Sequence, residues 1–402
     1  MKILFLTHRF PHPPNRGDSI RSFHFLRRMA SMGKVWLGTL YDQTPQEESW
    51  EVLNGLCENV LAVPWGKWGK WRRAAVSLAM GKTMTEGLFS HPVLRRGLQE
   101  WARQESWDVV VVFCSSMFPY IAAMEPIWTR RPRIVTDLVD VDSQKWFDYA
   151  REAPLWKKIL FRTEGKRLRE WEKKVGQKSD VLLAVTDEEV ALYRSFCPIE
   201  SIFSVPNGVD TEYFNAEQPF LQAEVEIPCR GVFVGALDYQ ANVEGVRWFL
   251  EKVLPPLRKR CPDFVLDIVG NRPTATLQQV CRNTPGAHLI GGVPDVRPYL
   301  KRTQVVVIPL QVARGLQNKV LEACSMGKAV VVSPCAAEGI QGVAGQDFVV
   351  CSSVEAWQQT LPRLFEEESR RTLLGQAGRK LVVEKYGWQT QLDRLASFLK
   401  VS

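Results

Sequence analysis

Short runs of valine, isoleucine and leucine recur along the chain, separated by longer stretches in which apolar residues are spaced three or four apart. Fully apolar runs are typical of strands buried on both faces of a parallel sheet, and the longer spacing is typical of amphipathic helices. The pattern therefore predicts an α/β fold. The predicted strands are 2–7, 34–40, 109–113, 133–138 and 181–185, then 231–234, 265–269, 288–290, 305–308 and 329–332.

Helices are expected between these strands. Ile20, Phe23, Arg27 and Ala30 share one helical face, and Asp18 and Ser19 offer an N-cap for this helix. A second helix is predicted over 248–260, with a local break at Pro255 and Pro256 because proline lacks the backbone N–H donor. A final amphipathic helix is predicted over 388–399.

Prolines at 198, 206, 219 and 228 divide the strand pattern into two halves. Because domains usually hold about 100–200 residues, the 402-residue length also fits two domains. We expect a Rossmann-like domain over 1–205, a second over 206–385, and a helix over 386–402 that packs back on the first. Doubly wound sheets bind ligands beyond the carboxyl ends of their strands, so the cleft between two such domains is the expected site.

Composition is that of a globular protein, with 45% hydrophobic and 24% charged residues and a net charge of +8. These values exclude a disordered chain and a coiled coil. Residues 1–200 carry 30 basic and 24 acidic side chains, so the first half holds most of the excess positive charge. The first domain is therefore expected to meet an anionic partner.

Cysteine and histidine usage predicts reduced thiols and no metal. The nine cysteines include no C-x-x-C pair, and the five histidines have no close cysteine or carboxylate partners. Only four apolar residues follow Lys2, and the longest uncharged stretch has 16 residues, which predicts neither a signal peptide nor a membrane span. We expect a cytoplasmic protein that can lie on the inner face of the cytoplasmic membrane.

Several common motifs are missing. The first strand is followed by Thr7-His8-Arg9 and not by the dinucleotide fingerprint, and Gly81-Lys82-Thr83 lacks the leading glycine of a phosphate-binding loop. No G-x-S-x-G elbow is present. Asp140-Val141-Asp142 is a D-x-D string, which a protein of this length can contain by chance.

The string Pro206-Asn207-Gly208-Val209-Asp210 is specific as a whole, although its backbone alone reads as a tight turn. It resembles the PNGVD signature of the family-four glycosyltransferases, and the resemblance covers about residues 2–395. The resemblance implies the GT-B fold, in which two doubly wound Rossmann-like domains face each other across a cleft. It also implies transfer of a sugar from a nucleoside-diphosphate sugar to an acceptor hydroxyl with retention of configuration.

Further segments of the second half look like the donor domain of that family. The segments 231–237, 267–270 and 291–296 look like its first two strands and its base-binding turn, and 314–323 looks like the start of its donor-binding helix. The implied donor contacts are Gly235, Gly270, Val293, Gly315, Leu316, Asn318, Lys319 and Glu322.

The chemistry of the 314–323 segment supports this reading. A glycine before a helix start presents free N–H groups and a positive dipole end to a diphosphate, and Lys319 adds a cation. Glu322 lies on the same helix face as Lys319 and can accept two ribose hydroxyls. The competing interpretation is a surface ion pair between Lys319 and Glu322.

The sequence departs from the family in three places. Arg314 stands where the family has an acidic residue, and Ala236 and Asn242 stand where it has two cations. We expect Arg314 and Lys319 to neutralise the leaving diphosphate instead. No cofactor and no essential metal are expected.

In the first domain, Gly17 looks like the family's loop glycine that approaches the donor. The family commonly has a histidine after the strand at 133–138, where this chain has Val139-Asp140. Asp140, or alternatively Asp142, is the predicted replacement that orients the acceptor hydroxyl. Helix capping is the competing role for this pair.

The segment Trp65–Arg73 interleaves tryptophans with basic residues, within a region (61–103) of eight basic and two acidic side chains. This composition suits an anionic membrane surface; stacking on nucleic-acid bases and a core-facing tryptophan row are the alternatives. We expect membrane contact and no nucleic acid.

The expected partners are a nucleotide-sugar donor and an acceptor glycan or lipid-linked sugar. Segments 137–146 and 314–322 resemble the sugar transferases associated with exopolysaccharide and exosortase systems. Two alternatives stay open: a catalytically degenerate GT-B scaffold at a membrane, and a UDP-sugar 2-epimerase-like enzyme.

Overall fold

The computed structural model describes residues 1–14, 17–66, 69–221, 224–313 and 315–400. The chain divides into two compact units. Unit 1 comprises Met1–Pro206 and Leu392–Ser402, and unit 2 comprises Asn207–Gln391.

Unit 1 contains a seven-stranded parallel sheet in the order β3-β2-β1-β4-β5-β6-β7. Its centre is formed by β1 and β4, where Ile3 pairs with both Val35 and Val109. Every residue of β4 is buried, which explains its unbroken valine run. The strands are β1 (Lys2–Thr7), β2 (Lys34–Tyr41), β3 (Asn59–Pro64), β4 (Val109–Phe113), β5 (Arg133–Val139), β6 (Val181–Ala184) and β7 (Ile202–Ser204).

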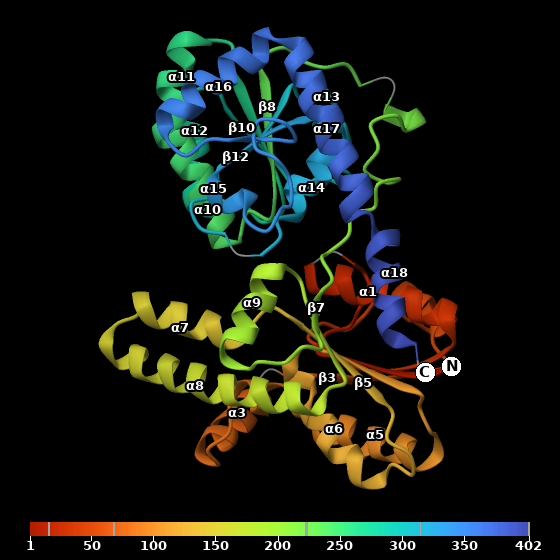
Figure 1. Cartoon of the computed structure of the whole chain (residues 1–402). Helices are drawn as coiled ribbons and strands as arrows, with labels where there is room; N and C mark the ends of the chain where they lie inside the picture. Colours follow the sequence, from red (N-terminus) through yellow and green to blue (C-terminus); the bar gives the residue numbers. More distant parts are fainter. Residues whose placement is uncertain (15–16, 67–68, 222–223, 314, 401–402) are drawn as a thin grey trace. The chain divides into compact units, whose positions relative to one another are not determined.

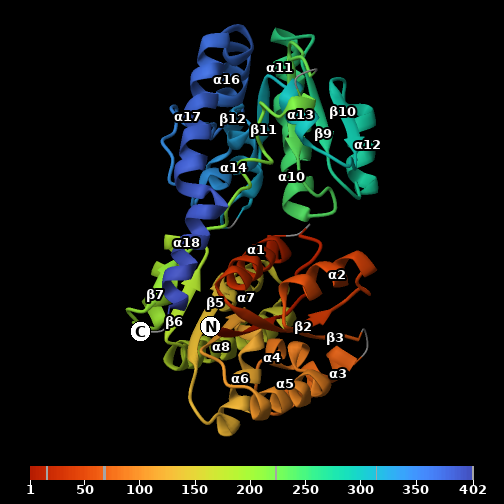
Figure 2. The same ribbon diagram turned by 90° about the vertical axis from the view of Figure 1, so that its right-hand side faces the viewer.

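Helices cover both faces of this sheet. Figure 2 shows α1 (Gly17–Met32) and α2 (Glu47–Leu56) on one face and α4 (Met84–Phe89), α5 (Pro92–Gln104) and α6 (Pro119–Met124) on the other. The remaining helices are α3 (Gly69–Ala79), α7 (Asp142–Glu152), α8 (Leu155–Lys178) and α9 (Asp187–Phe196).

The last helix, α18 (Trp388–Leu399), contacts unit 1 through its second half. Asp393 forms an ion pair of 2.7 Å with Arg28 of α1, and the ring of Phe398 stacks on Phe203 of β7 with centroids 4.7 Å apart. The first turn of α18 belongs to unit 2, where Trp388 packs so closely on Gly208 that a Cβ there would lie 2.5 Å from the indole.

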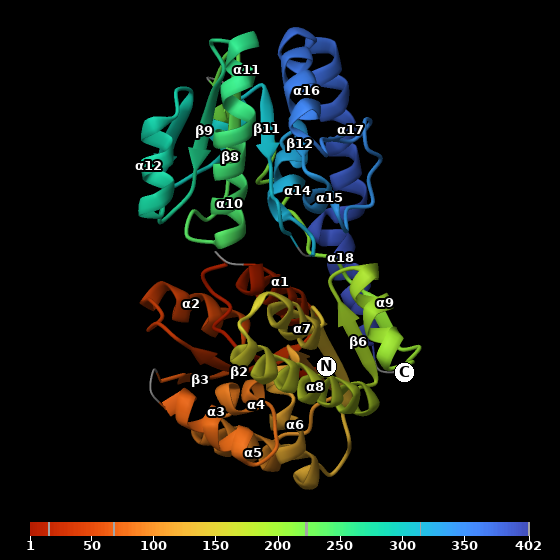
Figure 3. The same cartoon turned by 90° about the vertical axis from the view of Figure 1, so that its left-hand side faces the viewer.

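Unit 2 contains a six-stranded parallel sheet in the order β10-β9-β8-β11-β12-β13. Figure 1 shows α10, α11 and α12 on one side of this sheet and α13, α14 and α17 on the other, and Figure 3 gives a second view of the same layers. The strands are β8 (Arg230–Val234), β9 (Val265–Val269), β10 (Ala287–Gly291), β11 (Val305–Ile308), β12 (Ala329–Val332) and β13 (Val349–Val350). The helices are α10 (Gln240–Trp248), α11 (Leu254–Arg260), α12 (Ala275–Asn283), α13 (Arg297–Arg302), α14 (Asn318–Ser325), α15 (Pro334–Ala337), α16 (Val354–Glu366) and α17 (Glu368–Tyr386).

Every predicted strand is present, so the α/β prediction is confirmed. Three strands were missed, and each lies at a sheet edge: β3, β7 and β13.

The helix break predicted at Pro255 and Pro256 lies at a different place in the structure. The prolines lie inside α11, and the irregularity is a π-helical turn over Phe249–Val253, just before them. Because proline donates no hydrogen bond to the preceding turn, the helix widens there.

The nine cysteines are all free. Cys324 is buried, and Cys114 and Cys335 are partly exposed.

Candidate functional site

The start of α14 carries most of the predicted donor residues. The loop before it turns at Gly315, whose φ of +62° is a left-handed conformation that favours glycine, and Leu316 is buried beside it. No side chain caps the helix at Gln317. The side-chain oxygen of Asn318, in the first turn, is buried and has no hydrogen-bond partner among the described residues. The uncapped N–H groups of the helix start suit an anionic ligand, and the unpaired Asn318 oxygen can accept a hydrogen bond from a hydroxyl or N–H group of that ligand.

Lys319 and Glu322 lie one turn apart on this helix and make no direct ion pair in the described part of the chain, although each partly stabilises the charge of the other. Lys319 Nζ donates to the side-chain oxygen of Gln317 at 3.1 Å. The Glu322 carboxylate has no hydrogen bond or ion pair to any described residue. Burial lowers the pKa of Lys319 to about 8 and raises the pKa of Glu322 to about 7. Both charges are therefore costly without a ligand.

Arg314, which we expected to assist Lys319, lies outside the described residues. The structure therefore leaves Lys319 as the described cation at the start of α14.

Gly235 and Gly270 stand at the carboxyl ends of β8 and β9. A Cβ on Gly235 would lie 2.9 Å from Asn242 Nδ2, and a Cβ on Gly270 would lie 1.8 Å from the Gly235 carbonyl oxygen. Packing therefore accounts for both glycines, and their contact with a donor stays a prediction. Val293, in the turn after β10, is partly exposed.

Asn242 is a residue whose role the sequence did not reveal. It is 3% exposed, and its side-chain nitrogen donates to the carbonyl of Ala236 at 2.9 Å. It therefore holds the turn between β8 and α10 closed, at a position where the family has a cation. Its side-chain oxygen has no partner among the described atoms.

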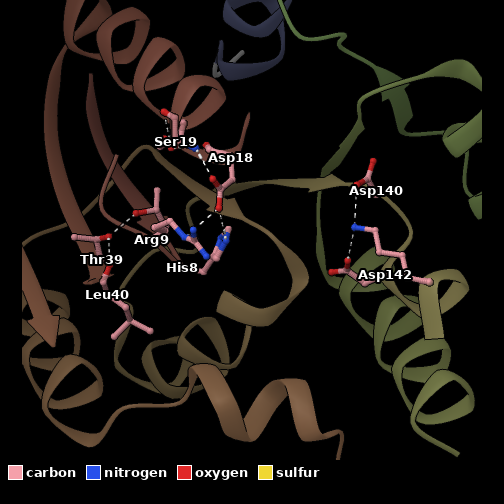
Figure 4. Close-up of polar contacts among 11 residues, drawn as sticks. His8, Arg9, Asp18, Ser19, Thr39, Leu40, Asp140 and Asp142 are labelled. Atoms are coloured by element: carbon pink, nitrogen blue, oxygen red, sulfur yellow. Dashed lines mark hydrogen bonds and ion pairs between the residues drawn. The ribbon is translucent and has the colours of Figure 1, made fainter. Parts of the chain in front are cut away.

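At the end of β5, Asp140 and Asp142 share one cation (Figure 4). Lys145 Nζ lies 2.9 Å from Asp140 and 3.1 Å from Asp142, and each carboxylate side chain is 29% exposed. Burial alone would lower the pKa of Lys145, but the two carboxylates outweigh it and raise that pKa. The Lys145 ammonium thus lies between the two carboxylates, where a metal ion would have to lie if the D-x-D string were a metal site. Among the described residues, no group of three or more histidine, cysteine or acidic side chains could hold a metal ion.

A second polar cluster, which the sequence did not suggest, lies at the end of β1 (Figure 4). Asp18 Oδ2 is 3.4 Å from His8 Nε2 and 3.1 Å from Arg9 Nε. Burial alone would raise the pKa of Asp18, but its hydrogen bond with His8 and the charge of Arg9 lower it to about 2. The His8 ring stacks on Phe113 with centroids 5.8 Å apart.

Gly17 begins α1 beside Asp18. A Cβ at Gly17 would meet no atom within 4 Å, so local packing does not require glycine there. The open space is consistent with the predicted approach of a ligand to the backbone.

Arg21 and Asp137 form a buried pair that fixes the end of β5. Arg21 Nε and Nη2 donate to Asp137 at 2.6 and 3.1 Å, and Arg21 Nη1 donates to the Val205 carbonyl at 2.7 Å. This pair connects α1 with β5 and with Val205 near the end of unit 1. Its two charges neutralise each other inside unit 1.

The segment Trp65–Arg73 is only partly available at the surface, and its Lys67 and Trp68 lie outside the described residues. Trp65 donates to the Leu88 carbonyl at 2.6 Å and stacks on Phe89. Trp71, by contrast, is 56% exposed. One tryptophan thus packs into unit 1 and another faces solvent. In the described chain, no helix is long and apolar enough to cross a membrane.

Residues 228–367 match the family described as glycosyl transferases group 1. An uncharacterized 44.6 kDa protein in the cps region of Klebsiella pneumoniae is 22% identical over 363 residues, which cover 87% of each chain. A GDP-mannose-dependent α-(1-6)-phosphatidylinositol monomannoside mannosyltransferase of Mycolicibacterium smegmatis is 28% identical over 246 residues. That alignment spans 56% of this chain and 64% of the relative, less than two thirds of its length.

Two solved structures show the same fold over nearly the whole chain. Sucrose-phosphate synthase from Thermosynechococcus elongatus has a TM-score of 0.69 at 13% identity and covers 99% of this chain and 98% of its own. Anabaena HepE, solved in complex with UDP and glucose, has a TM-score of 0.67 at 13% identity and covers 99% of each chain. The structural neighbours are GT-B glycosyltransferases, so the predicted GT-B fold class is confirmed.

Proposed function

We propose that this chain, which has the GT-B fold and matches the group 1 glycosyl transferases over residues 228–367, transfers a sugar from a nucleoside-diphosphate sugar to an acceptor hydroxyl with retention of configuration. The observation that carries the proposal is the start of α14. Lys319 and Glu322 are there partly buried, and the Glu322 carboxylate is unpaired among the described residues.

A bound donor would satisfy these groups. The helix start and Lys319 would receive the diphosphate, and the ionised Glu322 would accept hydrogen bonds from the ribose hydroxyls. As the donor breaks down, the diphosphate gains negative charge. A cation already positioned beside it stabilises that transition state more than the ground state.

Nucleotide binding is tested with a thermal-shift panel of UDP, GDP and their sugars. A ligand present at 100 times its dissociation constant stabilises the folded chain by about 2.7 kcal/mol. We expect one nucleotide family to raise the melting temperature and the others to leave it unchanged. If no nucleotide or nucleotide sugar shifts it, the donor site is refuted.

Retention is tested on the product. The anomeric configuration of the transferred sugar, read by NMR from the one-bond carbon–proton coupling, should equal that of the donor. An inverted product would contradict this part of the proposal. We also propose that no metal is essential, so activity should survive dialysis against EDTA.

We further propose a role in exopolysaccharide or lipid-linked glycan synthesis, in the branch associated with exosortase systems, with the chain at a membrane surface. The name of the Klebsiella relative, which places it in a cps region, and that of the mycolicibacterial phosphatidylinositol mannoside relative support this proposal. Transfer to lipid-linked acceptors and to free glycans, measured side by side, tests it. Equal transfer to both would contradict the lipid-linked part.

A further inference from the structure

A groove on unit 1 lies beside the Trp65–Arg73 segment, from which Gly69, Arg72 and Arg73 contribute to its lining. It is formed by two adjoining cavities of about 560 and 600 Å³ between α3, α4, α5, α6 and α8. Lys82, Glu86, Arg95 and Pro119 line both cavities, so the two are parts of one groove.

Basic side chains dominate the lining. Seven lysines and arginines line the two cavities, against the acidic residues Glu86 and Glu170. Both acids are engaged elsewhere: Glu86 accepts hydrogen bonds from Thr83 in a capping box, and Glu170 pairs with Lys173 at 2.7 Å. The basic residues are Arg72, Arg73, Lys82, Arg95, Lys166, Arg167 and Lys174.

Most of this positive charge is unneutralised. The side chains of Lys82, Arg95, Lys166 and Lys174 are exposed and form no hydrogen bond or ion pair with any described residue. Deeper in the groove, Arg73 Nε is buried without a partner among the described atoms. Uncompensated cations along one groove favour an anionic ligand.

The walls of the groove are fixed by α8. Glu164 accepts the N–H groups of Met84 and Thr85 at 2.8 and 3.1 Å, and Arg167 donates to the carbonyls of Leu78 and Lys82 at 3.2 Å each. The turn between α3 and α4 is therefore held against α8, and the cations keep their spacing. Figure 3 shows α3 and α8 on one face of unit 1.

Apolar side chains accompany the cations. Val76 and Met80 line the groove and are 58% and 67% exposed, and Trp71 on the same helix is 56% exposed. On α8, Ile159 is 71% exposed and Leu160 is 43% exposed. Exposed apolar residues beside cations suit a lipid interface, where side chains enter the headgroup layer and the cations meet phosphates.

We propose that this groove is the surface by which the chain binds an anionic lipid layer, with lipid phosphates held by Lys82, Arg95, Lys166 and Lys174. The inference rests on the membrane-surface part of the proposed function and extends the contact from Trp65–Arg73 to the turn between α3 and α4, to α5 and to α8. An acceptor carried on lipid would then be brought to unit 1 by the layer itself.

The test is co-sedimentation of the full chain with vesicles of phosphatidylglycerol mixed into phosphatidylcholine, at physiological salt. Replacing Lys82, Arg95, Lys166 and Lys174 by serine should weaken partitioning at least about tenfold, because each cation near an anionic surface contributes to binding. A matched control removes four exposed basic residues of unit 2: Lys252, Lys259, Arg282 and Lys380. This control should pellet like wild type.

Three results would overturn the proposal: failure of the wild type to pellet, equal pelleting of wild type and groove variant, and an equal loss in the control. Competition adds a further test, in which pyrophosphate or a single-stranded RNA is added at concentrations that saturate the groove. If the wild type still pellets in part with the vesicles, the vesicles are bound outside the groove, which would also contradict the proposal. Donor binding is measured on the same samples by thermal shift. A groove variant that no longer pellets with vesicles but still shows the nucleotide-induced thermal shift separates this inference from the donor site. A groove variant that pellets like wild type would refute this inference alone, whatever its thermal shift.

Discussion

Charged side chains gather both at the strand ends of unit 1 and at the start of α14 in unit 2, but their partners differ. In unit 1, Asp18 is bonded to His8 and Arg9, which lowers its pKa to about 2. In unit 2, burial lowers the pKa of Lys319 to about 8 and raises that of Glu322 to about 7. Partners in the protein stabilise the charged form of Asp18, whereas burial destabilises the charged forms of Lys319 and Glu322.

This difference separates two uses of buried charge. A charge that the fold already neutralises contributes to stability, and a charge that the fold leaves unpaired lowers stability until a ligand binds. Perturbed pKa values occur for both reasons, so the direction of the shift carries the information. The start of α14 has the properties of a ligand-binding site, and the Asp18 cluster has those of a group that stabilises the fold.

The largest expected effect is on nucleotide affinity. Glu322→Ala should raise the dissociation constant of the nucleotide sugar by about 10- to 150-fold, because charge-assisted hydrogen bonds to ribose are worth about 1.5–3 kcal/mol. Calorimetric titration measures it. Glu226→Gln is the control, since Glu226 is already paired with Lys328 at 3.1 Å and Arg371 at 3.0 Å. An unchanged affinity in Glu322→Ala would refute the ribose role.

The second-largest expected effect is on the turnover number of a Lys319 variant. Lys319→Ala should lower kcat by at least about tenfold, because about 1.4 kcal/mol of transition-state stabilisation corresponds to that factor. Steady-state kinetics at saturating donor measure the loss. Turnover within twofold of wild type would contradict the proposed role of Lys319.

Asp142 provides a matched control for the prediction that Asp140 orients the acceptor hydroxyl. Asp140 and Asp142 have the same exposure and share Lys145, so Asp140→Asn and Asp142→Asn perturb the ion pairs similarly. If Asp140 orients the acceptor hydroxyl, its variant should lose about tenfold in kcat while keeping donor affinity, and the Asp142 variant should lose much less. Equal losses would assign both residues to holding Lys145.

Stability should respond with opposite signs in the two regions. The pKa of Asp18 is lowered from 3.8 to about 2, so its stabilisation is present above pH 4 and is lost as the pH falls towards 2. Asp18→Asn should therefore lower the free energy of unfolding at pH 7 by about 1–2 kcal/mol, allowing for partial exposure. The difference from wild type should shrink below pH 4.

Glu322 should behave in the reverse way. Its pKa is raised from 4.5 to about 7, so the ligand-free wild type loses stability as the pH rises through that interval. Glu322→Gln should raise the melting temperature of the ligand-free chain at pH 8.5 and change it little at pH 4.5. Destabilisation at pH 8.5 would mean that Glu322 is a structural carboxylate like Asp18.

The sequence predicted those parts of the fold that burial dictates. The valine runs of β4, β11 and β12 are buried over their whole length, so composition alone located them. The edge strand β3 is partly exposed and β13 has two residues, so neither leaves a clear apolar pattern. Local sequence does not encode the pairing that makes them strands.

The candidate site residues divide in the same way, into those within one short segment and those brought together by the fold. Lys319 and Glu322 were proposed from the sequence because segment 314–323 resembles a family's donor-binding helix and helix spacing places both residues on one face. The contact of Asp18 with His8 and the groove between α3 and α8 depend on residues far apart along the chain, and no spacing rule connects them. A signal was present in the basic region 61–103, but the contribution of α8 to that surface required the structure.

The central claim is that Glu322 and Lys319 belong to the donor site, and proton linkage tests it most directly. Binding of a nucleotide sugar, whose diphosphate has no group titrating near neutrality, is measured by calorimetry in buffers of different ionisation enthalpy. Because the pKa of Glu322 is about 7 and that of Lys319 is about 8, the account predicts proton release on binding at pH 6.5 and proton uptake at pH 8.5. Glu322→Gln should abolish the release and Lys319→Met the uptake. Binding with no net proton transfer at either pH would contradict the assignment of the donor site to the start of α14.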